Sequence, residues 1–65
     1  MHKNTKRLLE LREQHGFTGK RIAEILGVKH QTAMIWLMKE SPRVIPFTKL
    51  YLLEVHLNGE FRKLD

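Results

Sequence analysis

The sequence predicts an all-α, compact four-helix domain, and three observations support this class. Apolar residues recur at helical spacings in four successive segments. Glycines stand where the first two segments end, at Gly16 and Gly27. Both prolines, Pro42 and Pro46, stand in the stretch before the last segment, where they favour a loop and a helix start. A length of 65 residues fits one domain over residues 1–65.

The first helix is expected to begin at a cap provided by Asn4 or Thr5 and to run to about His15. Gly16 then ends it, and Phe17 is expected to pack into the core before the second helix. The residues of this helix expected in the core are Leu8 and Leu11, with Leu9 at the edge.

The stretch from Gly19 to Met38 predicts two short helices joined by a tight turn, the second running from near Lys29 to near Lys39. Gly27 ends the first of them, because a turn this tight requires a positive φ that costs glycine nothing, and Val28 is expected to plug the turn. Such a pair is a helix-turn-helix, whose second helix enters the DNA major groove. The inward residues are Ile22, Ala23 and Leu26 in the first helix and Ala33, Trp36 and Leu37 in the second.

Two sequence patterns in this part of the chain point to a known family. The first is Ile22-Ala23-x-x-Leu26-Gly27-Val28-x-x-Gln31-Thr32-x-x-x-Trp36, and the second is Arg43-x-x-Pro46-x-x-x-Leu50-x-x-Leu53-x-x-x-Leu57. Together they resemble the Cro/cI-type (XRE-like) helix-turn-helix transcriptional regulators over about residues 17–57. This resemblance implies repression by occupancy of a DNA site.

The chain departs from that family at particular positions. A β-branched residue is usual where Ala33 stands, and Gln is frequent where Gly19 stands. The exit after Trp36 is Leu37-Met38-Lys39 instead of a Glu-Asn-Gly-like sequence. The short chain and its Pro-Phe-Thr entry to the last helix also resemble small phage repressors such as the anti-CRISPR-associated autorepressors.

Charge is distributed unevenly along the chain, whose formal net charge is +5. Residues 1–43 contain nine Lys or Arg against four Asp or Glu, whereas residues 44–65 contain three of each. The basic part includes the helix-turn-helix, and the neutral part is the apolar C-terminal segment. This asymmetry indicates that one end faces a polyanion and the other faces protein, although a generally soluble basic protein is the alternative.

The outward face of the second motif helix is expected to read DNA bases. Gln31 has the groups to pair with adenine, and apolar side chains can touch thymine methyl groups. An alternative for Met34 is that it extends the core, and we expect Met38 to do so towards the last helix. The predicted base-reading residues are His30, Gln31, Met34 and Ile35.

Phosphate contacts are expected around both ends of the motif. Thr18 should cap the helix that begins at Gly19, and the amides of Gly19 and Lys20 would hold a phosphate there, which the missing side chain of Gly19 would allow to approach. The alternative to a phosphate contact is that each basic side chain is simply solvated. The predicted phosphate contacts are Thr18, Gly19, Lys20, Arg21, Lys29, Thr32, Lys39 and Arg43.

The last helix is expected to begin near Pro46 and to end at Asn58-Gly59. Its core face would carry Leu50, Leu53 and Leu57, with Phe47 at its start. A second apolar face predicts a dimerisation segment over about residues 46–64. Residues 60–64 alternate polar and apolar, which leaves a short strand and a tail across the partner both open. The predicted interface residues are Tyr51, Leu52, Val55 and Phe61.

The sequence also limits the classes of function. It contains no Cys, and its four His show no i, i+4 pairing, so no metal, other cofactor or small-molecule ligand is expected, and we do not expect an enzyme. No apolar run approaches the ~18 residues of a membrane span, and no signal peptide is visible, which favours the cytoplasm.

Two functions remain from different classes. The leading one is a sequence-specific regulator that binds double-stranded DNA as a homodimer on a palindromic operator, acting as a repressor. The alternative is a helix-turn-helix module used for protein docking, in which Met34, Ile35 and Met38 would grip a partner helix.

Overall fold

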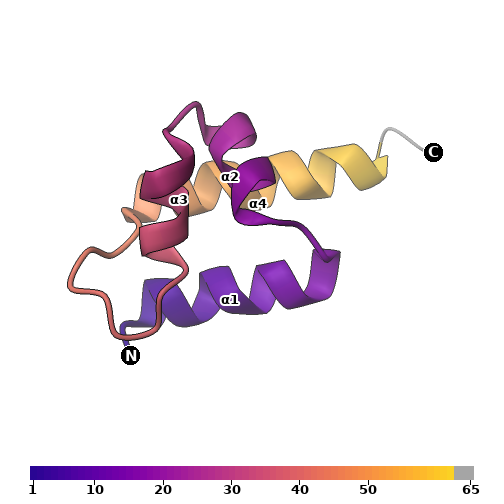
Figure 1. Ribbon diagram of the computed structural model, residues 1–65. Coiled ribbons are helices and arrows are strands. Elements are labelled where there is room, and N and C mark those ends of the chain that lie inside the picture. The colour runs from indigo at the N-terminus through magenta and orange to yellow at the C-terminus, as the bar shows by residue number, and fades with distance from the viewer. Residues whose placement is uncertain (63–65) are drawn as a thin grey trace.

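The computed structural model confirms an all-α domain of four helices (Figure 1). It describes residues 1–62, and side chains through residue 58. No strand occurs in this part of the chain. The helices are α1 (Lys3–His15), α2 (Gly19–Leu26), α3 (His30–Trp36) and α4 (Phe47–Arg62).

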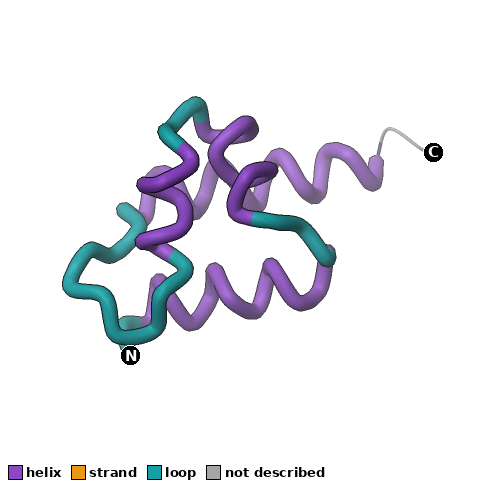
Figure 2. The backbone as a smooth tube through the Cα atoms, in the orientation of Figure 1, coloured by secondary structure: helices purple, strands orange, loops and turns teal. Residues whose placement is uncertain are grey.

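Helix α4 forms the support on which the other elements rest. It packs against both α1 and α2, while α2 packs most extensively against α3. The loop over residues 37–46, drawn in teal in Figure 2, is the longest connection and leads from the end of α3 back to the start of α4. The short pair α2 and α3 is therefore held on one side of a frame made by the two longer helices (Figures 1 and 2).

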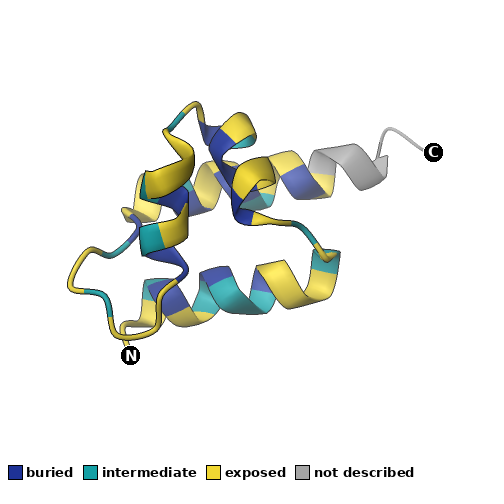
Figure 3. Cartoon of the chain, in the orientation of Figure 1, coloured by how far each residue is buried: buried dark blue, intermediate teal, exposed yellow. Residues whose placement is uncertain are grey.

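A single apolar core joins all four helices, as the dark blue segments of Figure 3 show. The structure confirms every core residue that the periodicity predicted in α1, α2 and α3, and the three leucines predicted in α4. Phe17 and Val28 are partly buried and pack against this core, also as expected. The buried residues are Leu8, Leu11, Ile22, Ala23, Leu26, Ala33, Trp36, Leu37, Ile45, Leu50, Leu53 and Leu57.

The cap of α1 differs from the prediction. His2 is the N-cap, and its Nδ1 accepts from the backbone N–H of Asn4 at 3.0 Å. Both predicted residues lie inside the helix, because it already begins at Lys3; Thr5 is buried, and the Asn4 side-chain amide donates to the Ile45 carbonyl at 3.1 Å. The bond from Asn4 ties the start of α1 to the loop before α4.

The ends of α1 and α2 follow the sequence prediction. Gly16 and Gly27 each have φ +66°, in the left-handed region that favours glycine. Thr18 caps α2 as predicted, its hydroxyl accepting from the backbone N–H of Arg21 at 3.2 Å. These local signals set where the α2–turn–α3 unit begins and where its turn lies.

Replacing Thr18 with Ala should destabilise the domain by about 0.5–2 kcal/mol, because one N–H of the first turn of α2 loses its acceptor. The free energy of unfolding measured by urea titration tests this. Thr48→Ala is the control, since Thr48 is exposed in the first turn of α4. Equal losses in the two variants would contradict a capping role for Thr18.

Helix α3 is shorter than predicted and ends at Trp36 instead of near Lys39. The Met38 N–H bonds to the Ile35 carbonyl at 3.1 Å, an i→i+3 contact that tightens the end of the helix. Leu37 is the last residue that this turn carries into the core. Met38 is 60% exposed, so the expectation that it extends the core is wrong.

Helix α4 is longer than predicted, because it continues through Gly59 to Arg62. A single glycine weakens a helix by only about 1 kcal/mol and does not end one without a left-handed conformation. The end predicted at Asn58-Gly59 is therefore wrong, as is a strand beginning at residue 60. Residues 63–65 lie outside the described part of the chain.

The start of α4 also differs from expectation. Ile45, just before the helix, is fully buried and occupies the core position that Phe47 was expected to fill. Phe47 is 67% exposed and stacks on Tyr51, with ring centroids 6.3 Å apart. The predicted core role of Phe47 is therefore wrong, because Ile45 is the residue that the chain buries at this end of α4.

An ion pair between Arg7 and Glu54 links α1 to α4. The Arg7 guanidinium contacts Glu54 Oε1 from Nη2 at 2.5 Å and from Nε at 3.0 Å, and this hydrogen bonding raises the pKa of Arg7 above its ordinary value. Both side chains remain partly exposed, so the pair contributes at most about 1 kcal/mol. No helix in the described residues has the length and apolar character needed to cross a membrane.

Candidate nucleic-acid interface

The candidate site is built on the α2–turn–α3 unit. Helices α2 and α3 pack against each other, and each buries a small residue, Ala23 in α2 and Ala33 in α3. The backbone N–H of Gly27 and that of Val28 both point to the Ala23 carbonyl, the latter at 3.1 Å, which closes the turn. The opposite face of α3 is left exposed to solvent.

That exposed face carries the residues predicted to read bases. His30 and Gln31 are exposed in the first turn of α3, and Met34 is 46% exposed one turn later. Ile35 is only half-buried, so part of its side chain is accessible. Lys29 lies just before them as the N-cap residue of α3 and is also exposed.

A shallow hollow lies between the end of α1, the first turn of α2 and α3. It brings together five of the predicted contact residues: Thr18, Gly19, Lys20, His30 and Met34. Phe17 and Leu37 add apolar surface, and Arg12 adds a guanidinium from α1. The site therefore combines a basic rim with an apolar floor.

Arg12 is the member of this hollow that the sequence did not identify. It lies in the last turn of α1, seven residues before Gly19. Nothing in its local sequence distinguishes it from other helical arginines. Its place in the site follows from the packing of α1 against the rest of the domain, which no periodicity specifies.

Gly19 has a packing role that the sequence did not predict. A Cβ atom at this position would lie 2.5 Å from the Met34 Sδ and 3.4 Å from the Leu37 Cδ1. Gly19 is accordingly buried, covered by α3. Its backbone N–H and that of Lys20 stand in the first turn of α2, where an α-helix provides no acceptor. A phosphate contact through these amides stays a prediction.

The remaining predicted phosphate contacts are distributed around the unit. Arg21 forms an ion pair with Glu24, Nη1 to Oε2 at 3.7 Å, so part of its charge is offset within α2. Thr32 is half-buried in α3, and Arg43 is exposed in the loop over residues 37–46.

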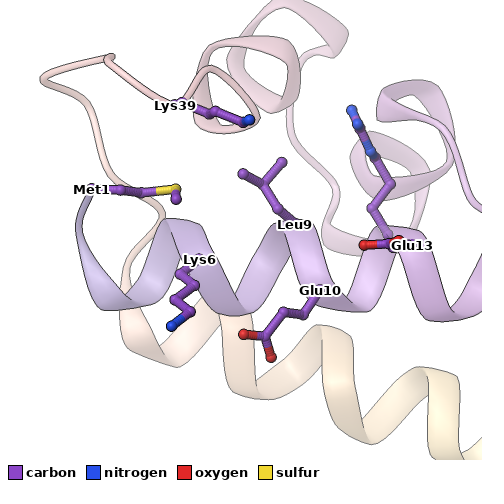
Figure 4. A pocket seen from close by; sticks show the side chains of 7 residues that line it. Met1, Lys6, Leu9, Glu10, Glu13 and Lys39 are labelled. Atoms are coloured by element: carbon purple, nitrogen blue, oxygen red, sulfur yellow. The ribbon is translucent and has the colours of Figure 1, made fainter.

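Lys39 lies in a second hollow rather than beside Lys20. This hollow is formed by the start of α1, its middle turns and the loop after α3. Figure 4 shows Lys39 reaching from that loop above Leu9, with the carboxylates of Glu10 and Glu13 on α1 below. The two glutamates make this hollow less basic than the one at the start of α2.

The predicted dimer surface lies on the outer face of α4. Three of its residues are exposed, and Phe47 joins them through its stacking on Tyr51. The side chain of Phe61 lies outside the described residues. We call this set the α4 strip; its members are 50–67% exposed and comprise Phe47, Tyr51, Leu52 and Val55.

Within the described residues, no group of three or more His, Asp or Glu side chains is placed to hold a metal ion. No family model, curated protein or solved structure matches the chain.

Proposed function

We propose that this chain is a sequence-specific regulator that binds double-stranded DNA through a helix-turn-helix and represses transcription by occupying its operator. The observation that supports this most is the exposed face of α3. It presents His30, Gln31 and Met34 beside the basic first turn of α2, where Lys20 stands. A helix placed this way can enter a major groove while its neighbour faces the DNA backbone.

The chemistry of the α3 face suits base reading. Gln31 can donate to and accept from adenine N6 and N7, and Met34 and Ile35 offer apolar atoms to thymine methyl groups. His30 lies at the N-terminal end of α3, the end that reaches base edges first in this class of domain.

The basic residues around α2 and α3 would supply most of the affinity. Each phosphate neutralised by Lys or Arg releases counterions, so binding weakens steeply as salt concentration rises. Lys20 and Lys29 are exposed at the starts of α2 and α3, and neither forms an ion pair with another residue that the structure describes. The amides at the start of α2 would add an uncharged contact to the same backbone.

We further propose that the chain binds as a homodimer through the α4 strip. Two copies related by a two-fold axis would place their α3 helices in successive major grooves, ~34 Å apart on a palindromic site. The resemblance to Cro/cI-type regulators supports the same arrangement. Such a regulator acts in the cytoplasm, with the DNA that it controls.

Two substitutions separate base reading from phosphate binding. Gln31→Ala should weaken binding to the selected operator by about 1–3 kcal/mol and leave binding to a scrambled duplex unchanged. Lys29→Gln should weaken binding to both duplexes and reduce the salt slope by about one ion. Fluorescence anisotropy across a salt series measures both.

Lys6→Gln is the matched control for the loss of one positive charge. Lys6 lies on α1 in the hollow with Glu10 and Glu13, where Lys39 is the one predicted contact residue. An equal loss from Lys6→Gln and Lys29→Gln would indicate a general charge effect. Equal losses on both duplexes from Gln31→Ala would exclude Gln31 as a base reader.

A second candidate function is protein docking through the same unit. It is favoured by the exposure of Met34 and Met38, whose flexible thioethers suit an apolar partner surface. This function predicts no binding of the chain to any duplex even at low salt.

A further inference from the structure

We propose that Gly19 determines the DNA sequence preference of this chain by allowing the Met34 thioether to lie back against the first turn of α2. This inference rests on the proposed function and deepens it. It concerns a residue that does not itself reach a base, and whose effect passes entirely through Met34.

The geometry leaves room for no side chain at Gly19. Its Cβ would lie 2.5 Å from Met34 Sδ and 3.5 Å from Met34 Cγ, whereas real Cβ contacts essentially never fall below 3.0 Å. The contact with Leu37 Cδ1, at 3.4 Å, is an ordinary van der Waals distance. Leu37 is buried in the core, whereas Met34 is 46% exposed. Any added side chain would therefore push Met34 outward and leave Leu37 in place.

No backbone requirement explains the glycine. Among the described residues, only Gly16 and Gly27 have positive φ. At Gly19 the backbone is helical, and alanine would favour the helix more strongly than glycine does. The residue that benefits from the missing side chain is Met34, because its thioether occupies the space.

The position of Met34 matters because of where it stands on α3. It lies four residues after His30 and three after Gln31, so the three side chains share one face of the helix. With its thioether against α2, Met34 would meet a base pair with the flank of its side chain and not with its methyl end. Displacement of Met34 from Gly19 would turn the methyl group towards the bases beside Gln31.

The experiment is a double-mutant cycle of Gly19→Ala and Met34→Ala, with the sequence preference of all four proteins read from the same random duplex library. Gly19→Ala should change the preferred base at one position in each half-site and weaken binding to the wild-type operator about tenfold. Binding to scrambled duplex should stay nearly the same, because the added Cβ would face Met34 and Leu37, whereas the predicted phosphate contact uses backbone N–H groups that alanine keeps. In the Met34→Ala background, Gly19→Ala should have no further effect, because no thioether remains to be displaced.

A structural readout accompanies the selection. In the wild type, a nuclear Overhauser effect should connect the Met34 side chain to the Gly19 Hα protons, and Gly19→Ala should remove Met34 from this contact. If Gly19→Ala alone does not fold, the double variant tests the inference. It contains no clash between a Cβ atom at position 19 and the Met34 thioether, so it should fold and select the same DNA sequence as Met34→Ala.

A wild type with a clear preference that Gly19→Ala leaves unchanged would overturn this inference alone. So would an effect of Gly19→Ala that persists without Met34. A wild type that binds DNA but selects no sequence would overturn the proposed function, and this inference with it.

Discussion

Leu53→Asp is expected to leave the chain unfolded at 25 °C. Leu53 is fully buried where α4 meets the rest of the core. The substitution removes a core side chain, at a cost of about 2–5 kcal/mol. It also buries a carboxyl group in the apolar core without a hydrogen-bonding partner, which costs several kcal/mol more. A domain of 65 residues has a free energy of unfolding of about 3–10 kcal/mol. The two costs together match or exceed this free energy.

Far-UV circular dichroism with a urea titration measures this, and Leu52→Asp is the matched control. Leu52 is the neighbouring residue on α4, with the same side chain, and is 54% exposed. The Leu52 variant should retain its helical signal and its cooperative transition. A folded Leu53→Asp variant with a normal transition would show that α4 does not pack as described.

Tyr51→Asp is expected to give a folded monomer that has lost at least about a hundredfold of its operator affinity. Tyr51 is 58% exposed and stacks on Phe47, so a charge there leaves the core intact but opposes burial of the α4 strip. Two linked recognition helices bind one operator with an effective concentration that a monomer lacks, and this link is worth about 10²–10⁴ in affinity. Sedimentation velocity and anisotropy on the same samples measure the two losses together.

Gln14→Glu is the control, because it changes the net charge by the same amount on an exposed residue of α1. It should stay dimeric and bind with nearly full affinity. A Tyr51→Asp protein that remains dimeric would place the interface elsewhere on the molecule. A monomeric Tyr51→Asp protein with full operator affinity would show that operator binding does not require a dimer.

Local signals in the sequence were enough to predict most of the fold. The spacing of Leu8 and Leu11, or of Leu50, Leu53 and Leu57, depends only on helical periodicity, and the structure buries all of them. Caps set by one residue and its near neighbours were also predictable, as Gly16, Gly27 and Thr18 show.

The features that the sequence did not predict depend on contacts between distant segments. The side-chain amide of Asn4 donates to the carbonyl of Ile45, 41 residues away, while His2 caps α1. Phe47 is exposed because Ile45 takes its place in the core. Met38 is exposed because α3 ends at Trp36, two residues before it.

The candidate site divides in the same way. The exposure of His30 and Gln31 follows from the helical phase of α3, which Ala33, Trp36 and Leu37 fix by pointing inward. The place of Arg12 in the hollow and the contact of Gly19 with Met34 arise only when α1, α2 and α3 are assembled. Sequence spacing therefore indicates which face of α3 is exposed, and the packing of α1, α2 and α3 determines the shape of the surface around it.

Selection from random duplex DNA at two salt concentrations tests the proposed function most directly. We expect enrichment of a palindrome whose half-sites are about one helical turn apart, with binding that weakens steeply at the higher salt concentration. Salt-sensitive retention without any enriched sequence would contradict sequence-specific regulation. No retention at the lower salt concentration would contradict DNA binding altogether and would favour a protein partner for Met34 and Met38.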